Sequence, residues 1–390
     1  MNRFLVVILT VNVFFGCTQN KIEDKKNNKP EKPASSNNIV KSSHEDSTIT
    51  FKLEDFLTEN TELNQTVDRI YNQLSDHQKV AQLIMPAMGK HGQKKELIDE
   101  LVANELIGGI LMLNGSKEQF KSWIEEYNTK NRKLGALPFL YSADAEPSLI
   151  NRKITNTTEV PKANTLKNKS EIISVTKTIS TELNDIGINY NFAPVVDMSP
   201  NKTVGWRSFG HAPDSVIPWS NAFIETSQKQ QIIATAKHFP GHGYVEGDTH
   251  KKLVYIDGKL KELKNYPPLI ESGVLSVMVG HIAIKNNGKF NTNNMPATIS
   301  KNIITNLLRE ELNFKGLIVT DALNMGGVSY IEDADIKSIK AGCDIALMPL
   351  NAKETHKKLL DVFQNNTSER LVFEKAIKRV IRMKLCVSSL

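Results

Sequence analysis

The chain is poor in cysteine, which excludes the classes of protein that depend on it. Only three cysteines occur in 390 residues: Cys17, Cys343 and Cys386. None of them belongs to a CxxC pair, so the sequence indicates neither a disulfide framework nor a thiolate zinc site. A content of 40% hydrophobic and 24% charged residues predicts instead an ordinary globular protein with a large core.

The chain also lacks a concentration of positive charge that would suit a nucleic acid. Its formal net charge is +6, and its basic residues are scattered apart from small clusters such as Lys25–Lys26 and Lys251–Lys252. No stripe of alternating aromatic and basic side chains accompanies them. We therefore expect no nucleic-acid partner.

The N-terminus has an apolar run that is too short to span a bilayer as a helix. FLVVILTVNVFF follows Arg3 and extends for twelve residues, which suits the core of a signal peptide. The run ends in FFGC, which resembles the lipidation site of a bacterial lipoprotein. We expect a signal peptide over residues 1–17, acylation of Cys17 and a lipid anchor in a membrane of the bacterial cell envelope, facing the periplasm or the exterior. A secretory signal with an incidental cysteine is the alternative.

Residues 18–50 lack large apolar side chains almost entirely. They are rich in Lys, Asn, Ser, Glu and Pro and cannot bury enough surface to fold. We expect a disordered tether that leads to a single folded domain over residues 51–390.

From residue 51 onward, short apolar runs alternate with amphipathic stretches. The runs are nearly continuous in apolar residues, as expected of strands that are buried on both faces. There are eight of them: 82–88, 107–113, 137–144, 188–197, 232–241, 274–284, 317–323 and 343–349. Eight strand–helix units predict an α/β fold, a (β/α)8 TIM barrel. A doubly wound open sheet is the alternative, although no GxGxxG motif follows the first run.

Two of the amphipathic stretches begin after a serine that can cap a helix. Ser75 and Gln78 form the pattern of a capping box ahead of the first run. Ser300 precedes KNIITNLLREEL, whose apolar residues share one helical face: Ile303, Ile304, Leu307 and Leu308. We expect helices at both places.

Polar residues stand at the carboxyl ends of five of the runs. They are Asp144, Asp197, the pair Lys237–His238, His281 and Asp321. In a barrel these ends meet on one face, where barrel enzymes keep their active sites. The sequence therefore predicts an enzyme, although a single aspartate after a strand often only caps a helix or forms a turn.

The loop KHFPGHGYVEGDTH, residues 237–250, carries a dense group of titratable side chains. Pro240 and the glycines prevent a helix, and a loop rich in His and Asp is more often a site than a packing device. Asp248 and His250 lie two residues apart and can face the same side. Asp248 would then orient His250 as a proton donor near neutral pH.

Asp321 lies in the apolar stretch VTDAL, where a carboxylate is costly unless it is paired or used. There it can attack an electrophilic carbon as a nucleophile. A carboxylate nucleophile together with a proton donor is what retaining glycoside hydrolysis requires, although the usual donor is a second carboxylic acid.

A metal site is an alternative use for the loop. His238, His242, Asp248 and His250 offer ligand types that zinc accepts. The Pro-Gly pair between the first two histidines prevents them from sharing a helix face as in HExxH. We expect neither a metal nor another cofactor, because hydrolysis by two side chains and water needs none. His238 can alternatively be a structural residue that is only hydrogen-bonded beneath the loop.

Four motifs together resemble one enzyme family. KHFPGHG followed by D-x-H, NFAPVVD, RSFG and FKGLIVTDAL are similar to the β-N-acetylglucosaminidase branch of glycoside hydrolase family 3, and the resemblance runs from about residue 80 to 349. It implies a single-domain (β/α)8 barrel, and we expect the protein to be a monomer. It also implies a retaining, exo-acting enzyme that removes terminal β-linked GlcNAc from peptidoglycan fragments, chitin oligosaccharides or glycans through a covalent glycosyl-aspartate.

The resemblance also implies a role for each matching residue. Asp321 is the nucleophile, and His250 is the general acid/base assisted by Asp248. The residues implied to contact the sugar are Asp144, Arg152, Arg207, Lys237 and His238.

The sequence departs from the family pattern at the rim of the expected pocket. Residues 144–152 are DAEPSLINR, in which Pro147–Ser148 replaces a glycine pair and Leu149 replaces the first arginine. Tyr244–Val245 replaces the Asp-Thr that often follows GHG. Three alternatives stay open. A histidine donor would repel an anionic acceptor less than a carboxylate, which leaves room for a phosphorylase. The others are a β-glucosidase or β-xylosidase of the same family, and a sugar-binding lipoprotein without turnover, which the altered segment 144–152 supports.

Overall fold

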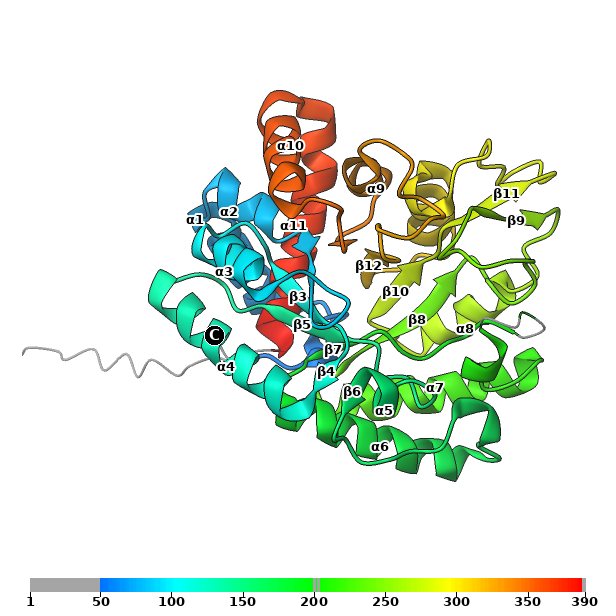
Figure 1. The fold of residues 1–390 in the computed structure, drawn as a ribbon. Helices are drawn as coiled ribbons and strands as arrows, with labels where there is room; N and C mark the ends of the chain where they lie inside the picture. The colour runs from blue at the N-terminus through cyan, green and yellow to red at the C-terminus, as the bar shows by residue number, and fades with distance from the viewer. Residues whose placement is uncertain (1–49, 199–200, 202–203, 388–390) are drawn as a thin grey trace, which may run out of the picture. The chain divides into compact units, whose positions relative to one another are not determined.

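The computed structural model describes residues 50–198, 201 and 204–387. The expected signal peptide, the lipidation site at Cys17 and nearly all of the expected tether lie outside the described residues. From residue 50 onward, helices surround parallel strands that cross the middle of the fold (Figure 1). Within the described part of the chain, no helix has both the length and the apolar character needed to cross a membrane.

Seven strands form the main sheet, and every pairing within it is parallel. The order across the sheet is β12-β10-β8-β7-β5-β3-β2. All residues of these strands are buried, as predicted for runs covered on both faces. Their bounds are β2 (Ala87–Met88), β3 (Gly109–Met112), β5 (Leu140–Ala143), β7 (Tyr190–Asn191), β8 (Ile233–Phe239), β10 (Ser276–Val279) and β12 (Leu317–Thr320).

The remaining strands pair two by two, again in parallel. β1 pairs with β13, so that each of the eight predicted runs contains a strand. The other two pairs, β4 with β6 and β9 with β11, lie in or beside the loops that follow the main strands. The bounds are β1 (Ile84–Met85), β13 (Ala346–Leu347), β4 (Gly115–Ser116), β6 (Ile154–Thr155), β9 (Val254–Asp257) and β11 (Ile282–Lys285).

The structure agrees with the predicted (β/α)8 barrel in its parallel strands and surrounding helices, but it does not show a closed ring. It is a TIM-barrel-like α/β fold made of a seven-stranded sheet and the separate pair β1–β13, and not one continuous ring of eight paired strands. Pro86 stands between β1 and β2 and has no N–H to donate to a strand ladder. An isolated bridge between Val319 and Ile345 joins β12 to the segment that leads into β13.

Helices cover the outer faces of the strands. In Figure 1, α4, α6 and α7 run together on one side of the fold, and α1, α10 and α11 gather on another. Their bounds are α1 (Thr61–Gln73), α2 (Asp76–Ala81), α3 (Lys95–Ala103), α4 (Lys117–Leu134), α5 (Ile150–Lys153), α6 (Lys169–Ile186), α7 (Pro213–Lys229), α8 (Tyr266–Glu271), α9 (Ala334–Ala341), α10 (Ala352–Asn365) and α11 (Thr367–Val387).

The two predicted serine caps have different outcomes. The capping box at Ser75 is confirmed, because the Gln78 amide donates to Ser75 Oγ at 3.2 Å and the Ser75 amide donates to Gln78 Oε1 at 3.1 Å. The side-chain cap at Ser300 is wrong. The helix there is a π-helix over Asn302–Glu311, and Ser300 instead accepts hydrogen bonds at its carbonyl. Its four predicted apolar residues are nevertheless buried.

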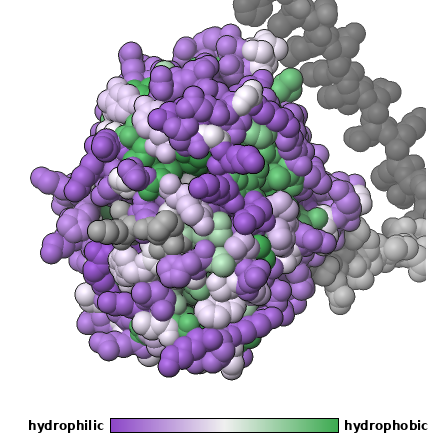
Figure 2. All heavy atoms as spheres, turned by 90° about the vertical axis from the view of Figure 1, so that its right-hand side faces the viewer, coloured by the Kyte–Doolittle hydropathy of each residue, from purple (hydrophilic) through white to green (hydrophobic). Residues whose placement is uncertain are grey.

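Polar side chains dominate the face shown in Figure 2, and apolar side chains show there in patches between them.

Helix α11 contains a buried lysine. Lys384 is 1% exposed, and its Nζ donates a hydrogen bond to the side-chain oxygen of Gln82, with no carboxylate partner among the described residues. Burial lowers the pKa of Lys384 to about 7. The interior therefore disfavours the ammonium form of this side chain.

Candidate active site

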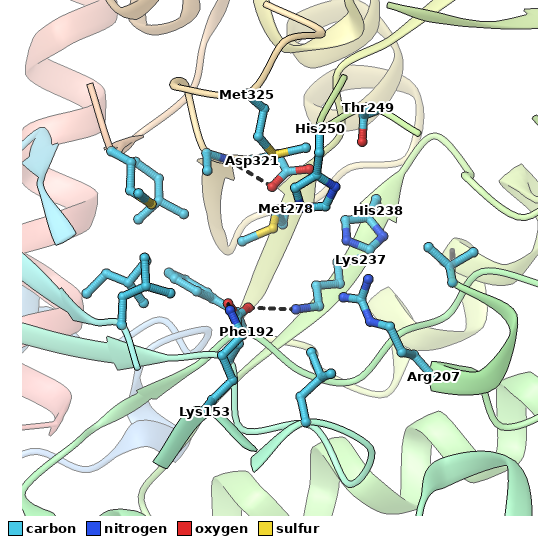
Figure 3. Close-up of a pocket in the computed structure, with 18 of the residues that line it drawn as sticks. Lys153, Phe192, Arg207, Lys237, His238, Thr249, His250, Met278, Asp321 and Met325 are labelled. Atoms are coloured by element: carbon cyan, nitrogen blue, oxygen red, sulfur yellow. Dashed lines mark hydrogen bonds and ion pairs between the residues drawn. The ribbon is translucent and has the colours of Figure 1, made fainter. Parts of the chain in front are cut away.

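One pocket collects all the catalytic and sugar-contacting residues that the sequence predicts. It has a volume of about 610 Å³ and lies where the carboxyl ends of the main strands meet. Its lining includes the three predicted catalytic residues and the five predicted sugar-contacting residues: Asp321, His250, Asp248, Asp144, Arg152, Arg207, Lys237 and His238. In Figure 3, Asp321 and His250 lie on one side of this space, and Lys237 and Arg207 lie on the other.

Two acids and two bases form an ion network on one side of the pocket. Asp144 directly follows β5, and Lys237 Nζ donates to its Oδ1 at 3.0 Å. The Arg207 guanidinium grips Glu146 through two bonds, from Nε at 2.8 Å and from Nη2 at 2.6 Å. Lys237 also lies 2.6 Å from Glu146 Oε1. Glu146 is fully buried, so it holds both cations in place from beneath.

The network keeps all its members charged. Burial alone would raise the pKa of Glu146, but the charges of Arg207 and Lys237 outweigh it and hold that pKa below its ordinary value. For Lys237, burial acts in the opposite direction and is outweighed by Asp144 and Glu146, so its pKa is raised. Fixed ions of both signs with unused lone pairs and N–H groups suit the hydroxyl groups of a sugar.

Glu146 is a residue that the sequence analysis did not assign. It stands inside the quoted segment DAEPSLINR, two residues after Asp144. A signal was available, because a second carboxylate beside a strand-end aspartate needs cations, and Lys237 and Arg207 were already candidates. Pairing across 61 residues of sequence cannot be derived from spacing alone.

The segment that departs from the family pattern still lines the pocket. Leu149 and Arg152 both face it, and the Arg152 side chain forms no hydrogen bond or ion pair with any described residue. Ser148 Oγ donates to the Trp206 carbonyl at 3.0 Å and accepts from the Ala163 amide at 2.9 Å. The serine therefore fastens the segment to two neighbouring loops.

A bulge in β8 explains how two consecutive residues reach one pocket. Successive side chains of a strand point to opposite faces, so Lys237 and His238 should diverge. In the pairing of β8 with β10, Met278 faces Lys237 but Val279 faces Phe239, so that His238 is passed over. A bulge of this kind re-aims a side chain, and both residues line the pocket.

Asp197 orients the histidine at this bulge. Its Oδ2 accepts from His238 Nδ1 at 2.7 Å, and its carboxylate also accepts from the amides of His238 and His242. Burial opposes ionisation of Asp197, but the two histidines outweigh it and lower its pKa. An ionised acceptor fixes the His238 proton on Nδ1 and leaves Nε2 without a partner among the described residues. The alternative that His238 is only structural does not account for its place in the pocket lining.

Asp248 and His250, the predicted proton-donor pair, are hydrogen-bonded to each other. Asp248 Oδ1 lies 2.8 Å from His250 Nδ1 and also accepts from the His250 amide at 3.0 Å. Burial would raise the pKa of Asp248, but the hydrogen bonds from His250 lower it, so the acid is ionised. The His250 side chain is 63% exposed, which leaves its Nε2 accessible to a ligand in the pocket.

Asp321 lies directly after β12 and is ionised in its surroundings. Burial opposes the charge, but the imidazoles of His281 and His238 outweigh it and lower the pKa of Asp321. Its Oδ1 accepts from the Ala322 amide at 2.8 Å. His250 makes a smaller contribution in the same direction. A charged carboxylate on the same side of the pocket as an exposed imidazole can serve double displacement at a sugar carbon.

The base of the loop rests on another acid that the sequence did not reveal. Glu262 Oε2 accepts from the Gly243 amide at 2.8 Å, and Oε1 accepts from the Met198 amide. Burial and the nearby charge of Asp197 raise the pKa of Glu262 to about 8.

Among the described residues, no group of three or more His, Cys, Asp or Glu is arranged to hold a metal ion.

The chain is similar to proteins of one family. A family model described as "Glycosyl hydrolase family 3 N terminal domain" matches residues 76–383. Beta-hexosaminidase A of Pseudoalteromonas piscicida is 32% identical over 238 residues, which cover 54% of this chain and 40% of that protein. The matched region is thus well under two thirds of that relative's length.

Two further similarities cover more of the chain. Beta-hexosaminidase of Histophilus somni (strain 2336) is 28% identical over 322 residues, which cover 77% of this chain and 87% of that protein. The solved structure of a glycoside hydrolase family 3 beta-N-acetylglucosaminidase from Paenibacillus sp. str. FPU-7 superposes with a TM-score of 0.73 at 26% identity. That match covers 80% of this chain and 63% of the other.

Proposed function

This chain belongs to glycoside hydrolase family 3, and from that premise we propose that it is a retaining, exo-acting β-N-acetylglucosaminidase. The observation that carries the proposal is the meeting of Asp321 and the Asp248–His250 pair in one pocket. The names of its relatives, which are hexosaminidases, support the choice of aminosugar.

In the first step, Asp321 attacks the anomeric carbon and forms a covalent glycosyl-aspartate. The glycosidic C–O bond breaks, and His250 transfers a proton to the departing oxygen. The imidazole then carries the proton that it has retained on Nδ1, and the ionised Asp248 keeps it oriented. In the second step, His250 removes a proton from water, the hydroxide oxygen bonds to the anomeric carbon, and Asp321 leaves.

The ion network would bind the sugar before either step. Asp144, Lys237 and Arg207 have hydrogen-bonding groups on the same wall as His238, and each can meet a hydroxyl group. Because Glu146 and Asp197 hold these side chains in advance, little freedom remains to be lost on binding. We propose these roles for all five predicted sugar-contacting residues, including Arg152.

A cleft beside the pocket supports a choice among the expected substrates. A space of about 750 Å³ shares His91, Asn114 and Arg152 with the pocket and continues to Lys90 and Trp123. None of the described residues that line it is acidic, and neither Lys90 nor Arg152 is ion-paired to a described residue. Cations beside an indole suit a sugar with a carboxylate. We therefore favour peptidoglycan fragments, which contain carboxylate-bearing muramic acid, over chitin oligosaccharides and neutral glycans.

The remaining expectations extend this proposal to the whole chain. We propose that β1–β13 closes the main sheet into one eight-stranded barrel, with β1 and β2 counted as one strand of the run 82–88, since the bridge Val319–Ile345 already links its two parts. We also propose a catalytic domain over residues 51–390 that acts as a monomer without a cofactor. The lipid anchor on Cys17, the tether and the place in the bacterial cell envelope rest on the sequence alone.

The decisive experiment is hydrolysis of an aryl β-N-acetylglucosaminide, with an aryl β-glucoside as the substrate control. We expect wild-type protein to cleave the aminosugar, and we expect Asp321→Ala and His250→Ala to lose at least about 100-fold in rate, since acid/base assistance alone contributes that much. Product analysis in phosphate buffer separates hydrolysis from phosphorolysis. A folded wild-type protein that cleaves neither glycoside would refute the proposal in favour of a sugar-binding lipoprotein.

A further inference from the structure

The segment that follows the nucleophile is bonded to the loop that carries the proton donor. The Gly326 amide donates to the His250 carbonyl at 3.0 Å, and the Gly327 amide donates to the Thr249 carbonyl at 2.9 Å. Both donors lie within six residues of Asp321. Two adjacent backbone hydrogen bonds therefore connect the two halves of the catalytic machinery directly.

Close approach explains why both donors are glycines. A Cβ atom on Gly326 would lie 2.5 Å from the Lys251 carbonyl oxygen and 2.9 Å from that of His250. On Gly327 it would lie 2.9 Å from His281 Cβ and 3.1 Å from the Thr249 carbonyl oxygen. Neither glycine has a positive φ, so space and not backbone conformation is the reason.

A buried histidine holds the other side of the same segment. His281 Nε2 donates to the Ala322 carbonyl at 2.9 Å, and its Nδ1 lies 2.7 Å from Thr298 Oγ1. His281 is fully buried at the end of β10. His281 thus fixes the start of the segment 322–327, and the last two residues of the segment contact the loop of His250.

The loop of His250 has few other anchors near the proton donor. Its first half is held by Asn201, whose Nδ2 donates to the carbonyls of Val245 and Gly247. Near the donor itself, His242 Nε2 lies 3.3 Å from Thr249 Oγ1, and the Asp248–His250 bonds are internal to the loop. Four residues after His250 the chain enters β9, which pairs with β11. The two glycine amides make the backbone hydrogen bonds that join the described residues of the loop directly to the segment after Asp321.

We propose that Gly326 and Gly327 are positioning residues that clamp the acid/base loop to the nucleophile segment. The clamp rests on the proposed function, because it has meaning only if His250 transfers protons in a reaction at Asp321. It acts through His250 and touches no substrate. Its effect should therefore be confined to steps that need proton transfer.

The test compares Gly326→Ala and Gly327→Ala with wild type and with the control Gly288→Ala. Gly288 has no atom within 4 Å of an added Cβ and has an ordinary φ, so the control adds the same methyl group harmlessly. We expect kcat/KM for a phenyl β-N-acetylglucosaminide, whose leaving group needs a proton, to fall about 100-fold in the clamp variants. For the 2,4-dinitrophenyl glycoside, whose leaving group needs none, kcat/KM should change by less than about threefold.

A second kinetic readout isolates the other proton transfer. Azide attacks the glycosyl intermediate without a general base, so it should raise kcat of the clamp variants on the dinitrophenyl glycoside and leave that of Gly288→Ala unchanged. An equal loss on both glycosides, with no azide effect, would show a general structural defect and overturn the clamp. Unchanged rates in both clamp variants would overturn it as well.

Amide hydrogen exchange keeps the clamp separate from the proposed function. In wild-type protein the amides of Gly326 and Gly327 should be protected, and in the clamp variants the peptide over residues 244–252 should exchange faster than in Gly288→Ala. If wild type hydrolyses no glycoside but this exchange pattern appears, the proposed function fails and the clamp on the loop stands. If wild type is active but Gly326 and Gly327 exchange freely, the clamp fails alone. This wild-type measurement decides even if neither alanine variant folds.

Discussion

Replacement of Glu146 by glutamine tests whether the proposed sugar-binding wall depends on a buried carboxylate. The substitution keeps the volume of the side chain and removes its charge. Glu146 is fully buried and accepts from Arg207 Nε, Arg207 Nη2 and Lys237 Nζ at 2.8, 2.6 and 2.6 Å. A glutamine can accept at one oxygen only, and its NH2 group would face a cationic donor.

The expected loss of stability follows from what stays behind. Lys237 keeps Asp144 as a partner, but Arg207 is left buried without its bidentate acceptor. Removal of one member of a buried ion pair typically costs about 3–5 kcal/mol, so we expect Tm to fall by roughly 10 °C. Because both cations lie on the pocket wall, KM for the aryl aminosugar should rise about tenfold, which corresponds to about 1.4 kcal/mol.

The assay combines thermal unfolding with KM and kcat, and Glu182→Gln is the matched control. Glu182 is also largely buried and ion-paired, to Lys117 at 2.7 Å, but it does not line the pocket. The control should lose stability without a change in KM. The pKa of Glu146 is depressed, so its contribution is present above the unfolded pKa and is lost as pH falls through the folded value. A Tm within 2 °C of wild type, or equal KM effects in both variants, would refute this account.

Two further predictions concern other buried groups. Asp197→Asn should lower kcat/KM about 10–100-fold, because an amide cannot fix the His238 proton on Nδ1 as an ionised acceptor does. Steady-state kinetics on samples that contain the same fraction of folded protein check this. An unchanged kcat/KM would contradict it. Lys384→Met should raise the free energy of unfolding, measured in denaturant. The folded pKa of about 7 lies below the unfolded value, so the ammonium form is penalised below pH 7, and wild-type stability should recover by about 1.4 kcal/mol per pH unit from about pH 7 to 10.5. The advantage of the methionine variant should therefore shrink over that range, and a constant advantage would count against the buried ammonium.

Much of the strand pattern could be predicted because burial on both faces leaves a plain signal. Each of the eight apolar runs contains a strand, yet most of the strands are shorter than the runs, as with β7 inside residues 188–197. Apolar loops that pack over a core give the same signal as strands, so the runs overestimate the ladders. The failure at Ser300 has a related cause, since a serine before an apolar stretch marks a boundary but does not determine which of its groups makes the cap.

The candidate site was predictable where a residue carries its chemistry in its own neighbourhood. Asp248 and His250 are close in sequence, and their hydrogen bond follows from local geometry. Glu146 and Glu262 act through partners that are 19 to 91 residues away, so only the fold brings those groups together. The position of His238 needed a bulge that no periodicity indicates.

The departure at residues 144–152 removes an arginine from the expected sugar-binding segment without removing the positive charge from the pocket. Leu149 lines the pocket where the family pattern has a cation, and Lys153, four residues later, lies 3.6 Å from Asp144 Oδ2. Lys153 also helps to hold the pKa of Asp144 below its ordinary value against the effect of burial, after the larger contribution of Lys237. Asp144 thus remains an ionised hydrogen-bond acceptor between two lysines. A lost sugar site would have no need to keep this carboxylate charged. The substitution therefore places an apolar side chain at Leu149 and leaves the charges around Asp144 in place.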